Sequence, residues 1–586
     1  MLKINRALIS VSNKNNILHL SKFLIDKNVT IISTGGTYQK LKESFDSNLI
    51  VEASNVIDFP EILEGRVKTL HPNIHGGILA KRDNIKHKID LENNGIEYID
   101  MVVCNLYPFK QTLESNDENL IIENIDIGGH SLIRAAAKNF NDVLVLTDPS
   151  DYQKIMDNWD KLDITFRKEQ AAKAFDYIVN YDMVISSYFN SNNIYRSYEK
   201  VKSLKYGTNP QQKFAGLYKN TDSEFPFQII NGNPGYINVL DAIYSWNLVS
   251  ELQLSTGLPS VASFKHNSPA GVAVFKEMTP QDRLVYFVPS DKQLTPVATA
   301  FIRARNADPM CSFGDFIAIS GIVDECTANL IKTEVSDGIV ALDYTKEALD
   351  ILMTKKNGSY IILKGTLLNN NNLEVREMHG VTLIQEENKK MTNFNSFNNI
   401  VCGNIPDSNK LDLIIGNTTL KYTQSNSVCA VKDGQVIGVG AGQQSRVDCV
   451  KLVKRKSINW FLRRHPKTLK LHDLFNKGIK RTDKINAIVQ YIENDIDDET
   501  LSMFQQIPDK LTDDEKNAFV NTLNDVSLAS DAMFPFTDNI FVAKQFGTKY
   551  IIQPGGSIAD DSIIKTCRDL DINMAFTGSE MRMFLH

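Results

Sequence analysis

The sequence lacks the features that mark several specialised classes of protein. Its 586 residues contain no uninterrupted apolar run of the roughly 18 residues that a membrane-spanning helix needs. The seven cysteines are scattered, and no two have the C-x-x-C spacing of a zinc or redox site. No apolar segment follows a basic start at the N-terminus, so no secretory signal is expected. We therefore expect a soluble chain with reduced thiols in the cytosol, without a membrane partner.

An excess of positive charge is also missing. Lysine and arginine total 64 against 70 aspartate and glutamate residues, which gives a formal net charge of −6. Bulk charge therefore does not favour a polyanion, and nucleic acid is not an expected partner. Hydrophobic residues make up 42% of the chain and charged residues 23%, as in ordinary globular proteins. At roughly 100–200 residues per domain, this length predicts about three or four domains, with room for more than one active site.

Apolar strands and amphipathic helices alternate along the first part of the chain. Continuous apolar runs predict strands at residues 7–10, 29–32, 99–103 and 143–146, interleaved with helices at 17–25, from about 38, at 131–139 and at 166–187. Strands that are apolar throughout are typical of a doubly wound parallel sheet, so an α/β fold is expected. A polar stretch predicts a boundary near residue 199, which divides the chain into residues 1–199 and 200–586.

Two polar turns follow the first and second expected strands. They are Ser12-Asn13-Lys14 and Thr34-Gly35-Gly36-Thr37. The carboxyl ends of parallel strands are where such sheets bind ligands, and hydroxyls, helix N-terminal N–H groups and a lysine suit a phosphate. Each turn alone is better explained as a helix N-cap. Their coincidence on neighbouring strands favours a phosphate site.

A dense polar segment runs from Arg66 to Gly77. Arg66 and Lys68 alternate, so an extended backbone would present both cations to one anion. His71 and His75 have the spacing of metal ligands on a helix, but the proline and glycines of this segment argue against a regular helix. We favour hydrogen-bonded loop histidines over metal ligands.

A candidate proton-transfer cluster comes next. Tyr107 follows the third expected strand, and Asp126 precedes a helix that carries Arg134 and Lys138 on one face. A lysine among other cations can lose its proton near neutrality, so Lys138 beside Tyr107 and Asp126 could act as an acid or a base. A solvated surface stripe of two cations is the alternative.

Long, unusual strings of residues occur in a fixed order along the whole chain. They include Lys68–Pro72, Cys104–Phe109, Asp126–Gly129, Arg134–Asn139, Lys205–Gln212, Ser312–Phe316, Lys421–Val428, Gly440–Arg446 and Arg582–His586. In these strings the chain resembles the bifunctional AICAR transformylase/IMP cyclohydrolase family of purine biosynthesis. The resemblance implies a methylglyoxal-synthase-like fold for residues 1–199. For residues 200–586 it implies a transformylase region of two cytidine-deaminase-like α/β/α subdomains.

The resemblance implies that residues 1–199 close the purine ring. The carboxamide nitrogen of formyl-AICAR attacks the formyl carbon, and loss of water gives IMP. Lys138, Tyr107, Asp126 and Lys68 are the implied catalytic groups. The implied contacts to formyl-AICAR and IMP come from Ser12, Asn13, Lys14, Thr34, Gly35, Gly36, Thr37, Arg66, Val67, Thr69, Cys104, Asn105, Ile127 and Gly128.

The resemblance implies that residues 200–586 transfer a formyl group from 10-formyltetrahydrofolate to AICAR. A weakly nucleophilic aromatic amine needs a base, and this role falls to His266, with Lys265 beside it and Asn426 orienting the reacting groups. Taken alone, the lysine–histidine pair is better explained as a surface cation beside a structural histidine. AICAR contacts are implied for Lys205, Tyr206, Gly314, Asp337, Arg446, Met533 and Arg582, and folate contacts for Val447, Asp538, Ser557 and Ile558.

Three positions depart from the family pattern. Lys205 stands in place of an arginine, Gln211 in place of a histidine and Met533 in place of an aromatic residue, which predicts altered AICAR affinity rather than lost activity. The resemblance further implies a homodimer with the transformylase sites at its interface and a structural potassium ion, without a catalytic metal. A cyclohydrolase with an impaired transformylase half and a non-catalytic nucleotide-binding scaffold are the alternatives.

Overall fold

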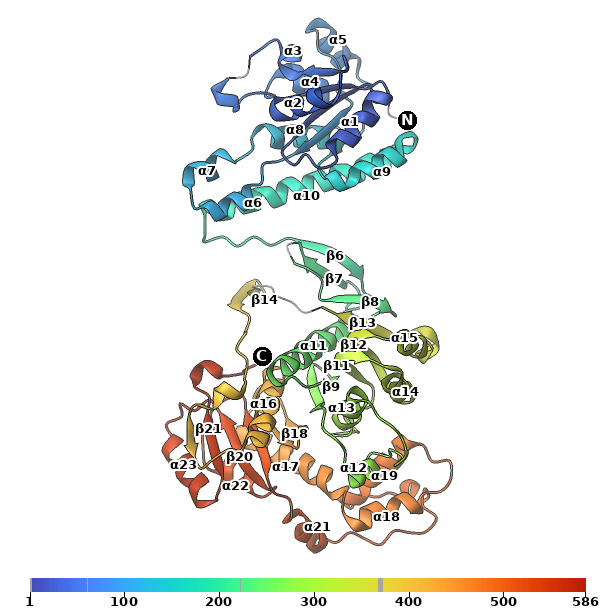
Figure 1. The fold of residues 1–586 in the computed structure, drawn as a ribbon, viewed down its shortest axis with the longest axis vertical. Coiled ribbons are helices and arrows are strands. Elements are labelled where there is room, and N and C mark those ends of the chain that lie inside the picture. Colours follow the sequence, from blue (N-terminus) through green and yellow to red (C-terminus); the bar gives the residue numbers. More distant parts are fainter. Residues whose placement is uncertain (1–2, 61, 222, 367–372) are drawn as a thin grey trace. The chain divides into compact units, whose positions relative to one another are not determined.

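Two compact units make up the chain. The computed structural model describes residues 3–60, 62–221, 223–366 and 373–586, and the units divide between Ser197 and Tyr198 (Figure 1). Unit 1 is residues 1–197 and unit 2 is residues 198–586. Among the described residues, no helix has the length and apolar character to cross a membrane.

A five-stranded sheet is the centre of unit 1. Its order is β3-β2-β1-β4-β5, and every neighbouring pair is parallel. Apolar clusters cover both faces, which confirms the doubly wound parallel sheet predicted from the continuous apolar runs. The strands are β1 (Arg6–Val11), β2 (Thr30–Ser33), β3 (Ile50–Glu52), β4 (Met101–Asn105) and β5 (Leu144–Leu146), and the main helices are α1 (Ile17–Asp26), α2 (Gly35–Ser44), α4 (Pro72–Leu79), α5 (Ile85–Asn93), α8 (Gly128–Lys138) and α10 (Ile164–Phe189).

Two helices of unit 1 differ from the sequence prediction. α2 begins at Gly35 rather than near residue 38, so both glycines belong to its first turn. α4 is a regular helix, although a loop was expected there. Pro72 takes the first helical position, where a missing N–H costs nothing, and His71 Nδ1 caps the helix by accepting the Asn73 N–H at 3.2 Å. The loop prediction was wrong because this proline starts a helix instead of breaking one.

Unit 2 contains a twelve-stranded mixed sheet that is built from two copies of one pattern. The copies meet at the neighbouring strands β10 and β18. Each copy consists of an antiparallel hairpin, a strand antiparallel to the hairpin, two further parallel strands and an antiparallel edge strand. The first copy comprises β8 (Phe227–Asn231), β9 (Ser260–Lys265), β10 (Ser268–Val274), β11 (Asp315–Val323), β12 (Ser336–Tyr344) and β13 (Ile361–Gly365), and the second β16 (Ile400–Cys402), β17 (Val428–Lys432), β18 (Gln435–Gly440), β19 (Val526–Ser530), β20 (Thr548–Gln553) and β21 (Asn573–Phe576).

Corresponding helices surround the two copies, which are green to yellow and orange to red in Figure 1. Each copy has a helix before its hairpin, a helix between the hairpin and the next strand of the sheet, and one helix after each of the two strands that follow the hairpin. The first copy has α11 (Tyr236–Thr256), α13 (Pro296–Arg305), α14 (Glu325–Thr333) and α15 (Lys346–Met353), and the second has α16 (Asp407–Lys421), α17 (Arg446–Leu462), α22 (Asp538–Lys544) and α23 (Asp560–Asp569). The second copy also carries α18 (Pro466–Leu474), α19 (Arg481–Glu493) and α21 (Asp513–Val520) between its hairpin and β19.

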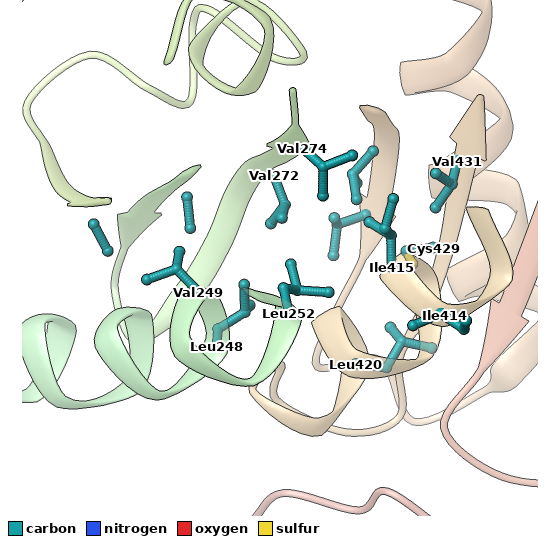
Figure 2. Close-up of a cluster of buried hydrophobic side chains, with 14 of the residues drawn as sticks. Leu248, Val249, Leu252, Val272, Val274, Ile414, Ile415, Leu420, Cys429 and Val431 are labelled. Atoms are coloured by element: carbon teal, nitrogen blue, oxygen red, sulfur yellow. The ribbon is translucent and has the colours of Figure 1, made fainter. Parts of the chain in front are cut away.

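One apolar core joins the two copies. Side chains of α11 and β10 pack with side chains of α16 and β17, as Figure 2 shows for Leu248, Val249, Leu252, Val272, Val274, Ile414, Ile415, Leu420, Cys429 and Val431. A buried ion pair links the same helices: Lys421 Nζ donates to Glu251 Oε2 at 2.6 Å, and the Tyr422 hydroxyl donates to the same oxygen at 2.8 Å. Burial and pairing together tie α11 to α16.

This ion pair predicts a large effect of a single substitution. Lys421→Met is expected to destabilise unit 2 by about 3 kcal/mol, because the Glu251 carboxylate would stay buried without its cation. The double variant Glu251→Gln/Lys421→Met, which removes both charges, should recover most of that loss. Urea unfolding of the full chain measures the difference, and equal stabilities of the single and double variants would contradict the assignment.

Candidate active sites

A cavity of about 500 Å³ opens at the carboxyl ends of the strands of unit 1. The turns after β1 and β2, the segment after β4 and the start of α8 line it, so the predicted convergence of polar turns is present. Asn13, Val67, Cys104 and Lys138 are the predicted residues that do not line it. Those that do are Ser12, Lys14, Thr34, Gly35, Gly36, Thr37, Arg66, Lys68, Thr69, Asn105, Tyr107, Asp126, Ile127 and Gly128.

The N-terminus of α2 and a lysine define one end of this cavity. Gly35 starts α2 with φ +48°, a left-handed conformation that suits glycine. A Cβ added at Gly35 would lie 3.4 Å from Lys68 Nζ, so the ammonium group approaches the first turn of the helix. Thr37 Oγ1 bonds to the backbone of Val11, which ties that turn to the end of β1. Helix N–H groups and an ammonium group are the donors that a phosphate needs.

Asn105 holds the turn of residues 12–14, which follows β1. Its Oδ1 accepts the Asn13 N–H at 2.7 Å, and its Nδ2 donates to the Asn13 carbonyl at 3.0 Å. The resemblance implies a substrate contact for Asn105, and in the structure both ends of its amide bind the backbone of the 12–14 turn. Asn105 therefore fixes the turn that carries Ser12 and Lys14.

Asp126 is one of two carboxylates that line this cavity, and Glu123 is the other. Asp126 Oδ1 accepts the Gly129 N–H at 2.7 Å at the start of α8. Burial raises the pKa of Asp126, and backbone N–H groups of Gly129 and Tyr107 oppose that shift. The Tyr181 hydroxyl accepts the Asp126 N–H at 2.9 Å, and the Tyr177 hydroxyl accepts the Leu106 N–H at 2.9 Å. Sequence reasoning missed these two tyrosines, although their spacing of four on α10 puts them on one helix face.

Two predicted residues have other surroundings. Arg66 pairs with Glu123, and both side chains are largely exposed. The backbone at Arg66 is helical rather than extended, although Arg66 and Lys68 both line the cavity. Lys138 is the last residue of α8, exposed, and roughly 15 Å along the helix from the cavity at 1.5 Å per residue. Within this chain Lys138 does not meet Tyr107 and Asp126.

The candidate residues of unit 2 collect at one edge of the twelve-stranded sheet. The hairpin β9–β10 turns at this edge, β11 and β12 begin there, and β18 and β19 end beside the start of β17. β20 ends at the same edge because it is parallel to β19. This edge therefore carries Lys265, His266, Gly314, Asp337, Asn426, Arg446, Met533, Asp538, Ser557 and Ile558 in the turns and helix starts next to these strand ends.

The β9–β10 turn presents the lysine–histidine pair. Lys265 Nζ donates to the Phe313 carbonyl at 2.7 Å, in the loop that leads to Gly314. His266 is exposed, and both His266 and Asn267 have left-handed backbones, with φ of 55° and 58°. The backbone between β9 and β10 is therefore a two-residue turn with positive φ at both positions.

A buried arginine that sequence reasoning missed organises the next two loops. Arg305 Nη2 donates to the carbonyl of Ser312 at 2.6 Å and to the carbonyl of Val335 at 2.7 Å, and the guanidinium also pairs with Asp315 and Glu334. Those loops carry Gly314 and Asp337. Asp337 itself pairs with Lys356 at 2.8 Å. Arg305 thus connects both implied AICAR loops to one buried group.

Arg446, for which an AICAR contact is implied, is occupied by partners within the chain. It is buried, pairs with Asp531 and donates to Ser530 Oγ at 3.0 Å. Its Nη2 donates to Asn426 Oδ1 at 2.8 Å, and Asn426 Nδ2 donates to the Gln443 carbonyl at 3.0 Å. Asp531, which is far away in the sequence, is the acidic partner of the guanidinium. Arg446 fixes the orientation of the Asn426 amide.

The remaining predicted residues of unit 2 lie at its surface. Lys205, Tyr206, Asp538, Ile558 and Arg582 are exposed, and Met533, Val447 and Ser557 are half-buried. The Ser557 loop is closed by Asp560, whose Oδ2 accepts the Gly556 N–H at 2.8 Å. Arg582 lies over the Phe584 ring, 5.1 Å from its centroid.

The fold and the candidate sites define the class of this protein: it is an α/β enzyme of two units, and each unit has its own group of cationic and titratable side chains. Family models give the particular identity: the AICARFT/IMPCHase bienzyme model matches residues 136–456, and an MGS-like domain model matches residues 16–131. The chain belongs to the AICARFT/IMPCHase bienzyme family. Its activities are those of a phosphoribosylaminoimidazolecarboxamide formyltransferase and an IMP cyclohydrolase, and the family is folate-dependent.

Similar proteins cover the whole chain. The bifunctional purine biosynthesis protein PurH of Clostridium botulinum strain Okra is 35% identical over 100% of both chains. The protein of the same name from Clostridium perfringens is 35% identical over 99% of both chains. The crystal structure of ForH is 31% identical to this chain; the match covers 32% of this chain and 100% of that one, with a TM-score of 0.29.

The packing around Asp126 predicts the effect of one added methyl group. A Cβ at Gly129 would lie 2.8 Å from Asp126 Oδ2, so Gly129→Ala must displace the carboxylate. We expect ring closure of supplied formyl-AICAR to slow about 100-fold, as for a misplaced reacting group. Formyl transfer to AICAR by the same variant is the internal control and should not change. Unaltered ring closure in the variant would show that the position of Asp126 does not matter.

Proposed function

We propose that the two activities reside in the two units: unit 1 closes formyl-AICAR to IMP, and unit 2 forms formyl-AICAR from AICAR and 10-formyltetrahydrofolate. The observation that carries this division is the gathering of the unit 2 candidates at one sheet edge, while the unit 1 cavity is lined by unit 1 alone. Each group of residues also supplies its own titratable side chains. Two reactions can thus proceed on one chain without a shared site.

In unit 1, Lys14 and the first turn of α2 are proposed to bind the phosphate. Asp126, whose pKa is raised by burial, accepts the proton of the carboxamide nitrogen as that nitrogen attacks the formyl carbon. Tyr107 lines the same cavity and orients the base. Lys68 stabilises the oxygen that leaves as water. Lys138, assigned to proton transfer by the resemblance, takes part only if a second chain brings it to this cavity.

In unit 2, His266 is proposed to take the proton of the AICAR amine as nitrogen attacks the formyl carbon of the folate. Lys265, held at the Phe313 carbonyl, stabilises charge on the formyl oxygen. Asn426, oriented by Arg446, binds the carboxamide. Lys205, Tyr206, Gly314, Asp337, Met533 and Arg582 are the proposed further AICAR contacts, and Val447, Asp538, Ser557 and Ile558 the proposed folate contacts.

A homodimer with the transformylase sites at its interface is part of the proposal. His266 and Asn426 lie at one sheet edge but about 10–14 Å apart, two to three strand spacings. A second chain can complete a site of that span. The two-stranded sheet of β14 (Leu373–Met378) and β15 (Val381–Glu386) supports association, because apolar side chains are exposed on both of its faces. Its exposed apolar side chains are Leu373, Met378, Val381, Leu383 and Ile384.

Three further expectations stay predictions. The first is a structural potassium ion, whose ligands would be backbone carbonyl and hydroxyl oxygens. Among the described residues, no group of three or more His, Cys, Asp or Glu side chains could hold a metal ion. The expectation of no catalytic metal is the second. A cytosolic location is the third.

An absorbance assay of the two reactions tests the division. His266→Ala is expected to abolish formyl transfer to AICAR and to leave ring closure of supplied formyl-AICAR within about twofold, because the base of one unit has no part in the other. Lys68→Ala should show the reverse pattern. Loss of both activities in either variant would refute the separation. A wild-type chain with ring closure alone would identify an impaired transformylase half, and one with neither activity a binding scaffold.

The same assay decides the part of Lys138. Lys138→Ala is expected to lose ring closure when the chain is dimeric and to complement Lys68→Ala in mixed dimers, because the two lysines would then serve one cavity from different chains. Ring closure at the wild-type rate in Lys138→Ala would assign the proton transfer to Lys68 and Asp126 alone.

A further inference from the structure

The two copies of unit 2 place one aspartate in the same position beside each hairpin turn. Asp241 lies in the second turn of α11 within Asn238-Val239-Leu240-Asp241, and Asp412 lies in the second turn of α16 within Asn409-Lys410-Leu411-Asp412. Both carboxylates are buried. Asp241 Oδ1 accepts the Asn267 N–H at 2.8 Å, and Asp412 Oδ1 accepts the Gly434 N–H at 2.6 Å.

The two turns correspond residue by residue. Lys265-His266-Asn267 closes β9–β10, and Lys432-Asp433-Gly434 closes β17–β18. Lys265 Nζ donates to the carbonyl of Phe313 just before β11, and Lys432 Nζ donates at 2.9 Å to the carbonyl of Asn524 just before β19. Because the copies are antiparallel at β10–β18, the second turn lies at the opposite edge of the sheet. It keeps the lysine and has no histidine.

The two turns differ in how well their residues suit the backbone. Both central residues of each turn have positive φ: 55° and 58° for His266 and Asn267, and 53° and 74° for Asp433 and Gly434. Asp-Gly is a favoured pair for such a turn, whereas a histidine pays roughly 1 kcal/mol or more for a left-handed backbone. The turn that carries the proposed base is therefore the strained one.

We propose that Asp241 is a positioning residue for formyl transfer, which holds the 265–267 turn in its left-handed conformation by accepting the Asn267 N–H and so presents His266 at the sheet edge. The inference rests on the proposed role of His266. Asp241 does not touch the substrate. A buried carboxylate on a rigid helix is suited to this task, since its bond to a backbone N–H is charge-assisted.

Neither of two other features of unit 2 holds the 265–267 turn in its left-handed conformation. The cavity of about 510 Å³ beside Asp412 and Asp433 is at the opposite edge and lacks a histidine. Arg305 holds the loops before β11 and β12 but makes no bond to residues 266 or 267 among its described contacts. Asp241 is the group whose described bond reaches the turn itself.

The internal repeat supplies a matched control for the test. Asp241→Asn and Asp412→Asn remove the same charge from equivalent buried positions, so their general cost to folding should be similar. The assay is run well above pH 6, because burial raises the pKa of both carboxyl groups to about 6. We expect kcat for formyl transfer to fall about 100-fold in Asp241→Asn, with KM for AICAR within about twofold, and to stay within about twofold of wild type in Asp412→Asn. Equal effects of the two variants on kcat, or a loss confined to KM, would overturn the proposal.

A rescue experiment separates a role in the turn from a merely structural role. Glycine adopts positive φ without strain, so Asn267→Gly should remove the need for the carboxylate. The double variant Asp241→Asn/Asn267→Gly is expected to regain at least tenfold of the lost kcat and to approach Asn267→Gly alone. A double variant as slow as Asp241→Asn would refute the proposal even if Asp241→Asn also lowers the melting temperature.

His266→Ala distinguishes the inference from the proposed function beneath it. If His266→Ala still transfers the formyl group, His266 is not the base, and both the proposed function of His266 and the positioning role of Asp241 are refuted. Loss of formyl transfer in His266→Ala together with full activity in Asp241→Asn would keep the base and refute the positioning role alone. Ring closure by unit 1 should be unchanged in every one of these variants.

Discussion

The pairing of β10 with β18 is the contact on which the architecture of unit 2 depends. It joins two six-stranded copies into one sheet, with Ala273 opposite Gln435. Gln435 is buried at this junction, where its Nε2 donates to the Arg303 carbonyl at 2.6 Å and its Oε1 accepts from the Tyr286 hydroxyl at 3.0 Å. A buried amide with both ends satisfied specifies one register, because any slip would leave it unpaired at a cost of about 1–3 kcal/mol. The position of every candidate residue at the sheet edge follows from that register.

The antiparallel junction also explains why two equivalent hairpins do not make two equivalent sites. It sends them to opposite edges, so each hairpin meets strand ends of the other copy. At one edge the Lys265-His266 turn faces Asn426 and its Arg446–Asp531 support. At the other, Lys432 is retained but an aspartate replaces the histidine, and the turn becomes a favoured Asp-Gly pair. The turn of the second copy has residues that suit its left-handed backbone, and it carries no proposed base.

Local patterns in the sequence predicted much of unit 1 and less of unit 2. Continuous apolar runs identified the parallel sheet, since strands buried on both faces cannot alternate. The phosphate turns followed from their place after β1 and β2. The pairing of Arg446 with Asp531 could not be predicted because the two residues are distant in sequence, and the separation of Lys138 from Asp126 within one chain follows from the length of α8. The resemblance implied two subdomains of one kind in unit 2. Residue patterns alone did not reveal the repeat, although N-x-L-D occurs in both α11 and α16, because only strand pairing shows that these segments are equivalent.

The central claim is that formyl transfer occurs at the sheet edge where the β9–β10 turn meets the starts of β11, β12 and β17. The most direct measurement is a crystal structure of the full chain with AICAR bound. The account predicts that the amine of the nucleotide lies within hydrogen-bond distance of a His266 side chain and that the Asn426 amide contacts the carboxamide. A nucleotide seated instead beside Lys432 and Asp433 at the opposite edge would contradict it.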